Sequence, residues 1–262
     1  MKKAAALLGG ALLVAHGALA AQPDIWTLGS GLHYNSGDYG TGTTTTILSV
    51  PLDIRYERTP WRFRISVPYV EIDGASSVIP GIGSVSNGNP RRRGVSAGAS
   101  GAASGLGDVV ASATYAAHYD PTARLGVDVT GKIKLGTADA DAGLGTGEHD
   151  FAALAEAFKT FDRTTFFAGI GHHWLGSSPL LRLDDVWSWS LGASYRIDQR
   201  DSAGVFYDGR ERVSSAAEPL SEITAFWSRR LDRAWKAQAY FLLGLADGSP
   251  DWGTGLSVAY AF

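Results

Sequence analysis

The stretch DWGTGLSVAYAF, residues 251–262, alternates between two kinds of side chain at every step. Its even-numbered positions, except Thr254, are apolar or aromatic, whereas its odd-numbered positions are small or polar. Because successive side chains of a β-strand point to opposite faces, this alternation predicts a strand with one apolar face. In a soluble sandwich that face would be inside, but in an outer-membrane barrel it lies outside, with aromatic residues at both ends.

The same period of two recurs in segments of about 9 to 11 residues, the length that a tilted membrane strand requires. We predict a closed antiparallel transmembrane β-barrel of about twelve strands, with ten to fourteen left open by the weaker segments. The expected strands lie near residues 25–35, 48–57, 62–69, 108–118, 127–135, 149–161, 164–175, 187–198, 202–212, 220–231, 235–245 and 251–262.

The connections between these segments alternate between short and long. Tight turns are expected at residues 58–60, 120–123, 162–163, 199–201 and 232–233. Longer loops are expected at 36–43, 74–106, 137–147, 176–184, 213–219 and 247–250, and the Gly/Ser-rich loop 74–106 is the longest. Such sorting predicts short periplasmic turns and longer extracellular loops, whereas a Greek-key sandwich would not be expected to sort its loops.

The ends of the chain and its composition set the compartment. Lys2 and Lys3, an apolar run from residue 4 to residue 14 and the sequence Ala18-Leu19-Ala20 predict a cleaved signal peptide, residues 1–20. The mature barrel, residues 21–262, is then expected in the bacterial outer membrane. Without cysteine the chain has neither a disulfide framework nor a thiolate metal site, and a net charge of -3 argues against nucleic-acid binding.

Three glycine-rich motifs carry a family resemblance. The run Ser104-Gly105-Leu106-Gly107-Asp108 precedes an alternating strand, and it is followed by GKIKLGT at residues 131–137 and GLGTG at 143–147. Over about residues 104–176 the chain resembles the MetA-pathway phenol-degradation family. It departs from the family's Leu-Pro-Thr-Gly-Asp run, because residues 135–139 read Leu-Gly-Thr-Ala-Asp. The resemblance implies an outer-membrane barrel that passes small aromatic or apolar molecules, and it implies no individual site residue.

Three short groups of residues are candidate sites. Residues 143–147 lack the Lys-Ser/Thr of a phosphate loop, so a surface loop is favoured. The acidic residues Asp139, Asp141, Glu148 and Asp150, with His149, could hold calcium or act as acid and base, and a solvated loop is the favoured alternative. The pair 172–173 cannot jointly bind one metal, because adjacent strand side chains face opposite ways.

The residues expected to face the lumen are charged or aromatic. They are Arg62, Arg64, Asp128, Lys132, Lys134, Glu156, Arg196, Phe206, Asp208, Arg210, Glu222, Phe226, Arg230, Lys236 and Tyr240, with Asp53 and Arg55 beside them. Such a lumen must be hydrated or ion-paired, because unpaired buried charges are costly. Phe206, Phe226 and Tyr240 could form an apolar strip. Arg91, Arg92 and Arg93 could constrict the mouth, or could bind lipopolysaccharide phosphates from a disordered extracellular loop.

These features predict a channel or transporter for small molecules, with membrane lipid and lipopolysaccharide as surroundings. The terminal Phe262 resembles the signal read by the barrel-assembly machinery. We expect no catalytic residue, no metal and no cofactor. Three alternatives remain open from the sequence: a plugged structural or adhesion barrel, an outer-membrane hydrolase, and a soluble secreted β protein.

Overall fold

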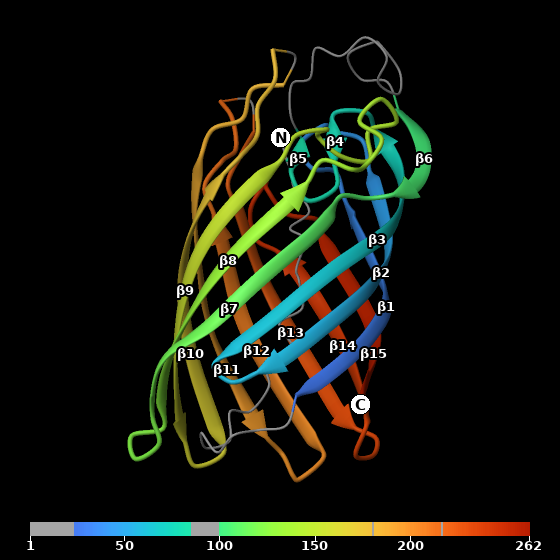
Figure 1. The fold of residues 1–262 in the computed structure, drawn as a ribbon. Helices are drawn as coiled ribbons and strands as arrows, with labels where there is room; N and C mark the ends of the chain where they lie inside the picture. Colours follow the sequence, from blue (N-terminus) through green and yellow to red (C-terminus); the bar gives the residue numbers. More distant parts are fainter. Residues whose placement is uncertain (1–23, 85–99, 180, 216) are drawn as a thin grey trace.

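The computed structural model describes residues 24–262 except 85–99, 180 and 216 (Figure 1). The predicted signal peptide and the three arginines at 91–93 lie outside the described residues, so both remain predictions. Among the described residues, no helix is long and apolar enough to cross a membrane.

The described chain consists of β-strands and their connections. The strands are β1 (Ile25–Gly37), β2 (Thr45–Arg58), β3 (Trp61–Ala75), β4 (Val78–Ile79), β5 (Gly83–Ser84), β6 (Ser100–Leu106), β7 (Val109–Asp120), β8 (Leu125–Leu135), β9 (Asp150–Phe161), β10 (Thr164–Trp174), β11 (Val186–Arg196), β12 (Asp201–Arg210), β13 (Leu220–Arg230), β14 (Trp235–Gly244) and β15 (Trp252–Ala261).

Backbone pairing closes the sheet into a barrel (Figure 1). Each strand pairs antiparallel with its neighbours, β1 pairs with the last strand β15, and β2 pairs with both β1 and β3. Strands β6 and β7 pair with successive parts of β3 and are separated only by Gly107 and Asp108. They therefore share one position in the wall, so thirteen paired strands make a closed barrel of twelve positions. The predicted fold is confirmed.

The predicted loop 74–106 is too long at both ends. Ser100–Leu106 forms β6, whose seven residues pair with residues 69–75 of β3. Alternating small residues carry almost no hydrophobic signal, which is why the sequence reading missed this strand. Residues 78–84 form a short hairpin of β4 and β5 inside the shortened loop. Only residues 76–99 therefore connect β3 to β6.

The connections sort by length between the two ends of the barrel. The turn end carries residues 59–60, 121–124, 162–163, 197–200 and 231–234, and the loop end carries the longer connections. Each turn is closed locally. Asp232 accepts hydrogen bonds from the backbone N–H groups of Ala234 and Trp235, at 2.8 Å each. These bonds hold the pKa of the Asp232 carboxyl below its usual range.

The outer surface of the wall is apolar. Leu191 and Leu256 are 57% and 66% exposed at mid-strand, and every strand of the wall carries at least one large apolar or aromatic side chain that is exposed. Aromatic pairs lie at both rims, such as Trp61 with Tyr115 at the turn end and Tyr34 with Trp252 at the loop end. A monomeric soluble protein rarely exposes so large an apolar surface, whereas a transmembrane barrel requires one with aromatic girdles.

We predict that an arginine on this outer face is far more damaging than one on the inner face of the same strand. Leu191→Arg should lower the free energy of unfolding by roughly 2 to 4 kcal/mol, because the charge would lie in hydrocarbon. Ser190→Arg is the matched control, since Ser190 faces inward beside Asp208. The measurement is a urea titration of refolding into lipid vesicles. A larger loss for Ser190→Arg would invert the assignment of the two faces.

Candidate functional site

The charged and aromatic residues predicted for the lumen lie on the strand faces opposite the exposed apolar side chains. Those that are fully or partly buried are Arg62, Arg64, Asp128, Lys132, Lys134, Glu156, Phe206, Asp208, Arg210, Glu222, Phe226, Lys236 and Tyr240. Arg196 and Arg230 end their strands at the turn end and are exposed there. Arg196 donates to the carbonyl oxygen of Asp162 in the neighbouring turn, at 3.3 Å.

Part of the inward charge is paired across the wall. Arg62 of β3 forms an ion pair with Asp128 of β8, and Arg64 donates two hydrogen bonds to Asp53 at 2.9 and 3.0 Å. Pairing of this kind reduces the cost of placing charges inside a narrow barrel.

Lys134 is the centre of a buried network at the loop end. Its Nζ atom lies 3.2 Å from Asp108 and 2.8 Å from Asp150, and it donates to the hydroxyl of Thr146 at 2.9 Å. Asp108 also accepts the backbone N–H of Ala138 at 3.0 Å. The network therefore ties the interruption between β6 and β7 to β8, β9 and their connecting loop.

The three glycine-rich motifs of the sequence meet in this network. Asp108 belongs to SGLGD, Lys134 to GKIKLGT and Thr146 to GLGTG. Gly145 is required for close approach, since a Cβ there would lie 2.8 Å from both the Asp108 carboxylate and Ala138. The three motifs are thus joined in one structural network, the Lys134 network. The favoured interpretation of residues 143–147 as a loop agrees with this geometry.

The acidic residues of the same loop do not converge on one site. Asp150 forms an ion pair with Lys134. Asp139 accepts a hydrogen bond from the backbone N–H of Ala142 within its own turn, at 3.0 Å. Within the described ranges there is no group of three His, Cys, Asp or Glu side chains that could hold a metal ion.

His172 and His173 face opposite sides, as the strand geometry predicts. The ring of His172 lies 4.7 Å from each of two outer tryptophans, Trp174 and Trp187. His173 faces inward and shares a hydrogen bond of 2.9 Å with the hydroxyl of Ser188.

The strand register places four carboxylates in one row around the inner wall. Following the paired residues from β8 to β13, this acidic row reads Asp128, Glu156, Gly169, Ser190, Asp208 and Glu222. Asp208 and Glu222 are direct cross-strand partners. The two middle positions, Gly169 and Ser190, place no large side chain between the carboxylates.

An aromatic row lies two residues nearer the turn end on the same strands. It reads Tyr119, Gly126, Phe158, Phe167, Gly192, Phe206 and Thr224 from β7 to β13. The rings of Phe167 and Phe206 are 6.4 Å apart, and Phe226 lies 6.0 Å beyond Phe206. The inner wall therefore carries a charged row directly above an aromatic one.

Loops fold over the mouth of the barrel at the loop end. One apolar cluster packs Tyr39 and Leu144 against Val70 and Ile72 of β3, together with Val78 of β4. Burial, followed by the nearby charges of Glu222 and Asp251, raises the pKa of Tyr39 above its ordinary range, so this hydroxyl stays neutral.

The β4–β5 hairpin crosses this mouth. Its Ile79 and Ile82 pack in a second apolar cluster with Leu181 and Val213 of the loops beyond β10 and β12, and with Val186 at the start of β11. Arg210 of β12 donates to the carbonyl oxygens of Gly81 and Ile82, at 3.3 and 3.1 Å. Since β12 lies six positions from β3 in a barrel of twelve, the hairpin reaches from one wall to the opposite wall. The loop after β3 therefore constricts the mouth, through residues 78–84.

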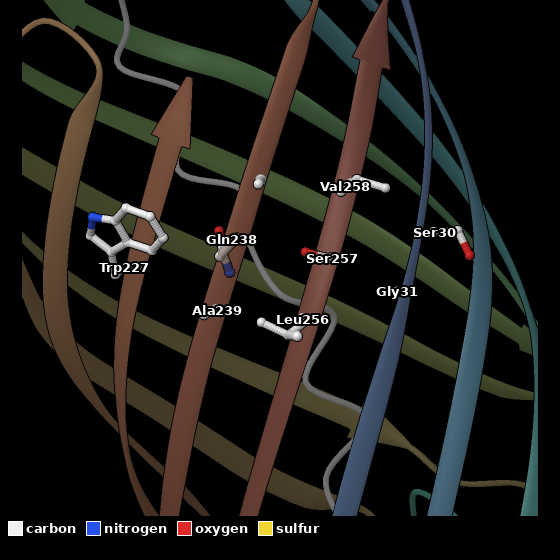
Figure 2. A pocket seen from close by; sticks show the side chains of 9 residues that line it. Ser30, Gly31, Trp227, Gln238, Ala239, Leu256, Ser257 and Val258 are labelled. Atoms are coloured by element: carbon white, nitrogen blue, oxygen red, sulfur yellow. The ribbon is translucent and has the colours of Figure 1, made fainter. Parts of the chain in front are cut away.

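A shallow groove of about 440 Å³ lies over β13, β14, β15 and β1 (Figure 2). Trp227, Leu256 and Val258 line it from the exposed outer face, where the intervening residues are small. Because the groove belongs to the apolar exterior, the lumen rather than this groove is the candidate site.

Sequence reasoning missed several residues that matter in the lumen. Phe158 shares the inward parity predicted for Glu156 but was not itself predicted to face the lumen, and Phe167 lies on a segment that alternates weakly. Their signal is the pair Gly126 and Gly192, which become informative only when the cross-strand register is known. Asp108 and Asp150 were recognised as polar but not as partners of one lysine.

Comparisons with known proteins agree with this architecture. No protein-family model and no curated protein matches the chain. Among solved structures, the COG4313 outer membrane channel from Pseudomonas putida F1 matches with a TM-score of 0.72 and 14% identity, covering 95% of this chain and 100% of that one. The NanC porin matches with a TM-score of 0.59 and 10% identity, covering 89% of this chain and 98% of that one. The KdgM porin matches with a TM-score of 0.55 and 8% identity, covering 90% of this chain and 99% of that one. At these identities the likeness establishes the fold.

We predict that Lys134 is essential for the stability of the loop end. Lys134→Met would leave Asp108 and Asp150 buried without their cation, which should cost about 3 to 5 kcal/mol of unfolding free energy. Lys132→Met is the control, because Lys132 lies on the same face of β8 and has no ion pair within the described residues. Unfolding would be followed by heat-dependent gel mobility and by urea titration. Equal losses of unfolding free energy for the two variants would contradict the stabilising role of the Lys134 network.

Proposed function

We propose that this protein spans the bacterial outer membrane and conducts small molecules through its lumen. The observation that carries the proposal is the polarity of the closed wall: apolar and aromatic outside, charged inside. A soluble barrel or sandwich would have the opposite arrangement, because its core must be apolar. The fold shared with an outer membrane channel and two porins supports the same compartment and role.

The proposal extends to membership of the MetA-pathway phenol-degradation family. Its support is that the three quoted motifs come together in the Lys134 network, as residues of one structural unit would. Transport of small aromatic or apolar compounds is part of this proposal. An exposed terminal Phe262, 68% accessible and hydrogen-bonded through its backbone to Trp26, supports recognition of the C-terminal strand by the assembly machinery.

A hydrolase is the weaker candidate. The hydrogen bond between His173 and Ser188 has the composition of a nucleophile and its base. However, the charges that act on the His173 ring include those of Lys132 and Arg210, and both would oppose an imidazolium during proton transfer. A catalytic pair would need an orienting acceptor in their place.

The channel proposal predicts ion conductance that is limited by the hairpin at the mouth. Purified protein in planar bilayers should give discrete current steps. Ala75 and Ser100 are cross-strand partners, so residues 76–99 can be replaced by a two-residue Asn-Gly turn without moving the wall. This variant should conduct more than the full-length protein.

Arg210→Gln tests the same constriction without a deletion. It removes the charged donor to Gly81 and Ile82 and should raise the open probability, whereas Arg212→Gln, on an exposed loop residue, should not. Flat traces from the full-length protein and from the turn-replaced variant would favour a plugged structural barrel.

The same proposal predicts the orientation in the membrane. Trypsin added to intact cells should cut after residues 91–93 but not after Arg233, which is exposed in a turn at the opposite end. After the outer membrane is permeabilised, Arg233 should become cleavable. Cleavage at Arg233 alone in intact cells would show the reverse orientation.

A further inference from the structure

The acidic row contains carboxylates that the described residues do not fully pair or hydrogen-bond. Asp128 has its ion pair with Arg62, whereas no ion pair within the described residues involves Glu156, Asp208 or Glu222. Glu222 is 0% exposed, and neither of its carboxylate oxygens has a hydrogen-bond partner in this part of the chain. The hydroxyl of Ser249, which lies close to Glu222, donates to the carbonyl oxygen of Ser221 at 2.8 Å.

Other unpartnered polar atoms surround this carboxylate. They include one oxygen of Asp208, the hydroxyl of Thr224 on the next inward position of β13, and the hydroxyl of Tyr39. A buried polar group without a partner costs free energy, and native proteins seldom leave several together. The cluster therefore lacks a component that the described residues do not supply.

The charge of the cluster indicates what this component is. Arg210, two residues from Asp208 on the same face, directs both Nη groups to Gly81 and Ile82. The carboxyl groups of Asp208, Glu222 and Glu156 outnumber the two inward cations on the neighbouring rows nearer the loop end, Arg210 and Lys132. A cation neutralises such a surface. An ammonium cation also donates hydrogen bonds to carboxylate oxygens.

The aromatic row indicates what kind of cation fits. Phe206 lies two residues below Asp208 on β12, a step of about 7 Å along a strand. Phe167 and Phe226 flank Phe206. An ammonium group held at the acidic row would place an attached ring or short chain on these faces, where stacking and cation–π attraction both contribute. A bare inorganic ion would make no use of the aromatic row.

We infer that Asp208 and Glu222, with the phenylalanines below them, form a lumenal binding site for small amphipathic organic cations, namely primary ammonium compounds with an aromatic or apolar body. The site rests on the proposed channel function and names a substrate class for it. It lies beneath the mouth that the β4–β5 hairpin constricts, so an ammonium compound entering from the loop end reaches it after passing the hairpin. The acidic row then selects against anions, and the aromatic row selects against strongly hydrated ions.

The test is binding of radiolabelled phenethylammonium to the full-length barrel in detergent, measured by equilibrium dialysis at neutral pH. Saturable binding of one molecule per barrel is expected. Glu222→Gln and Asp208→Asn should each weaken it by about tenfold or more, because each removes a charged acceptor. Phe206→Ala should weaken it by a factor of about 3 to 10. Glu218→Gln, the matched control on the exposed loop between β12 and β13, should leave binding unchanged.

Competitors separate this site from simpler ones. Neutral 2-phenylethanol and anionic phenylacetate should not displace the label at equal concentration. Displacement by potassium as effective as that by unlabelled phenethylammonium would reduce the site to a general cation site and overturn the organic class. No saturable binding would overturn the inference entirely, and would indicate that water or a proton shared between the two carboxylates completes the cluster. Heat-dependent gel mobility verifies that each variant is folded, and Asp208→Asn, at a half-buried position, still tests the site if Glu222→Gln fails to fold.

Conductance distinguishes failure of this inference from failure of the channel proposal. In a conducting barrel, phenethylammonium should block the current, and Glu222→Gln should relieve the block. A barrel that binds the label but never conducts would disprove the channel and leave the site intact. A barrel that conducts without binding the label would disprove the site and leave the channel intact.

Discussion

The closed ladder of backbone hydrogen bonds is the constraint on which the rest of this molecule depends. Hydrocarbon offers no partner to a free N–H or C=O group, so a spanning sheet can have no unpaired edge. Here the first and last strands complete the ladder, with ten register pairs from Thr27 and Ala261 to Ser36 and Trp252. Once the ring is closed, every side chain must point either to the exterior or to the lumen. The two-residue alternation of the sequence is the direct consequence.

Closure creates a second demand, because it forces charges of the inward face into a narrow space. The protein meets this demand in two ways. Around Lys134 one ammonium group bridges two carboxylates, and the network holds the break between β6 and β7 against β8 and β9. Along the acidic row, one carboxylate oxygen of Asp208 and both of Glu222 have no hydrogen-bond partner among the described residues. The first arrangement stabilises the wall, whereas the second is costly for folding and is intelligible as part of a binding surface.

The sequence reveals the strands and the identity of most inward residues, because both follow from local alternation and turn chemistry. Twelve positions, sorted connections and the inward placement of Phe206 and Phe226 were all predicted in this way. Long-range register is not local, so the rows, the Lys134 network and the reach of the hairpin to Arg210 could not be predicted. Strand β6 was missed for a different reason: its alternating residues are nearly all small, and its pairing with β3 depends on the neighbouring strand.

Register also explains how the lumen can hold a row of large rings. The ring of Phe158 lies over Gly126 on the neighbouring strand, and the ring of Phe167 lies over Gly192, where any Cβ atom would collide with it. Each ring therefore packs along the wall, where it is 8% exposed, instead of projecting across the lumen. The glycines, which weaken a strand when considered alone, provide the space into which these aromatic rings pack. Their placement beside the acidic row couples the packing of the wall directly to the chemistry that the lumen can select.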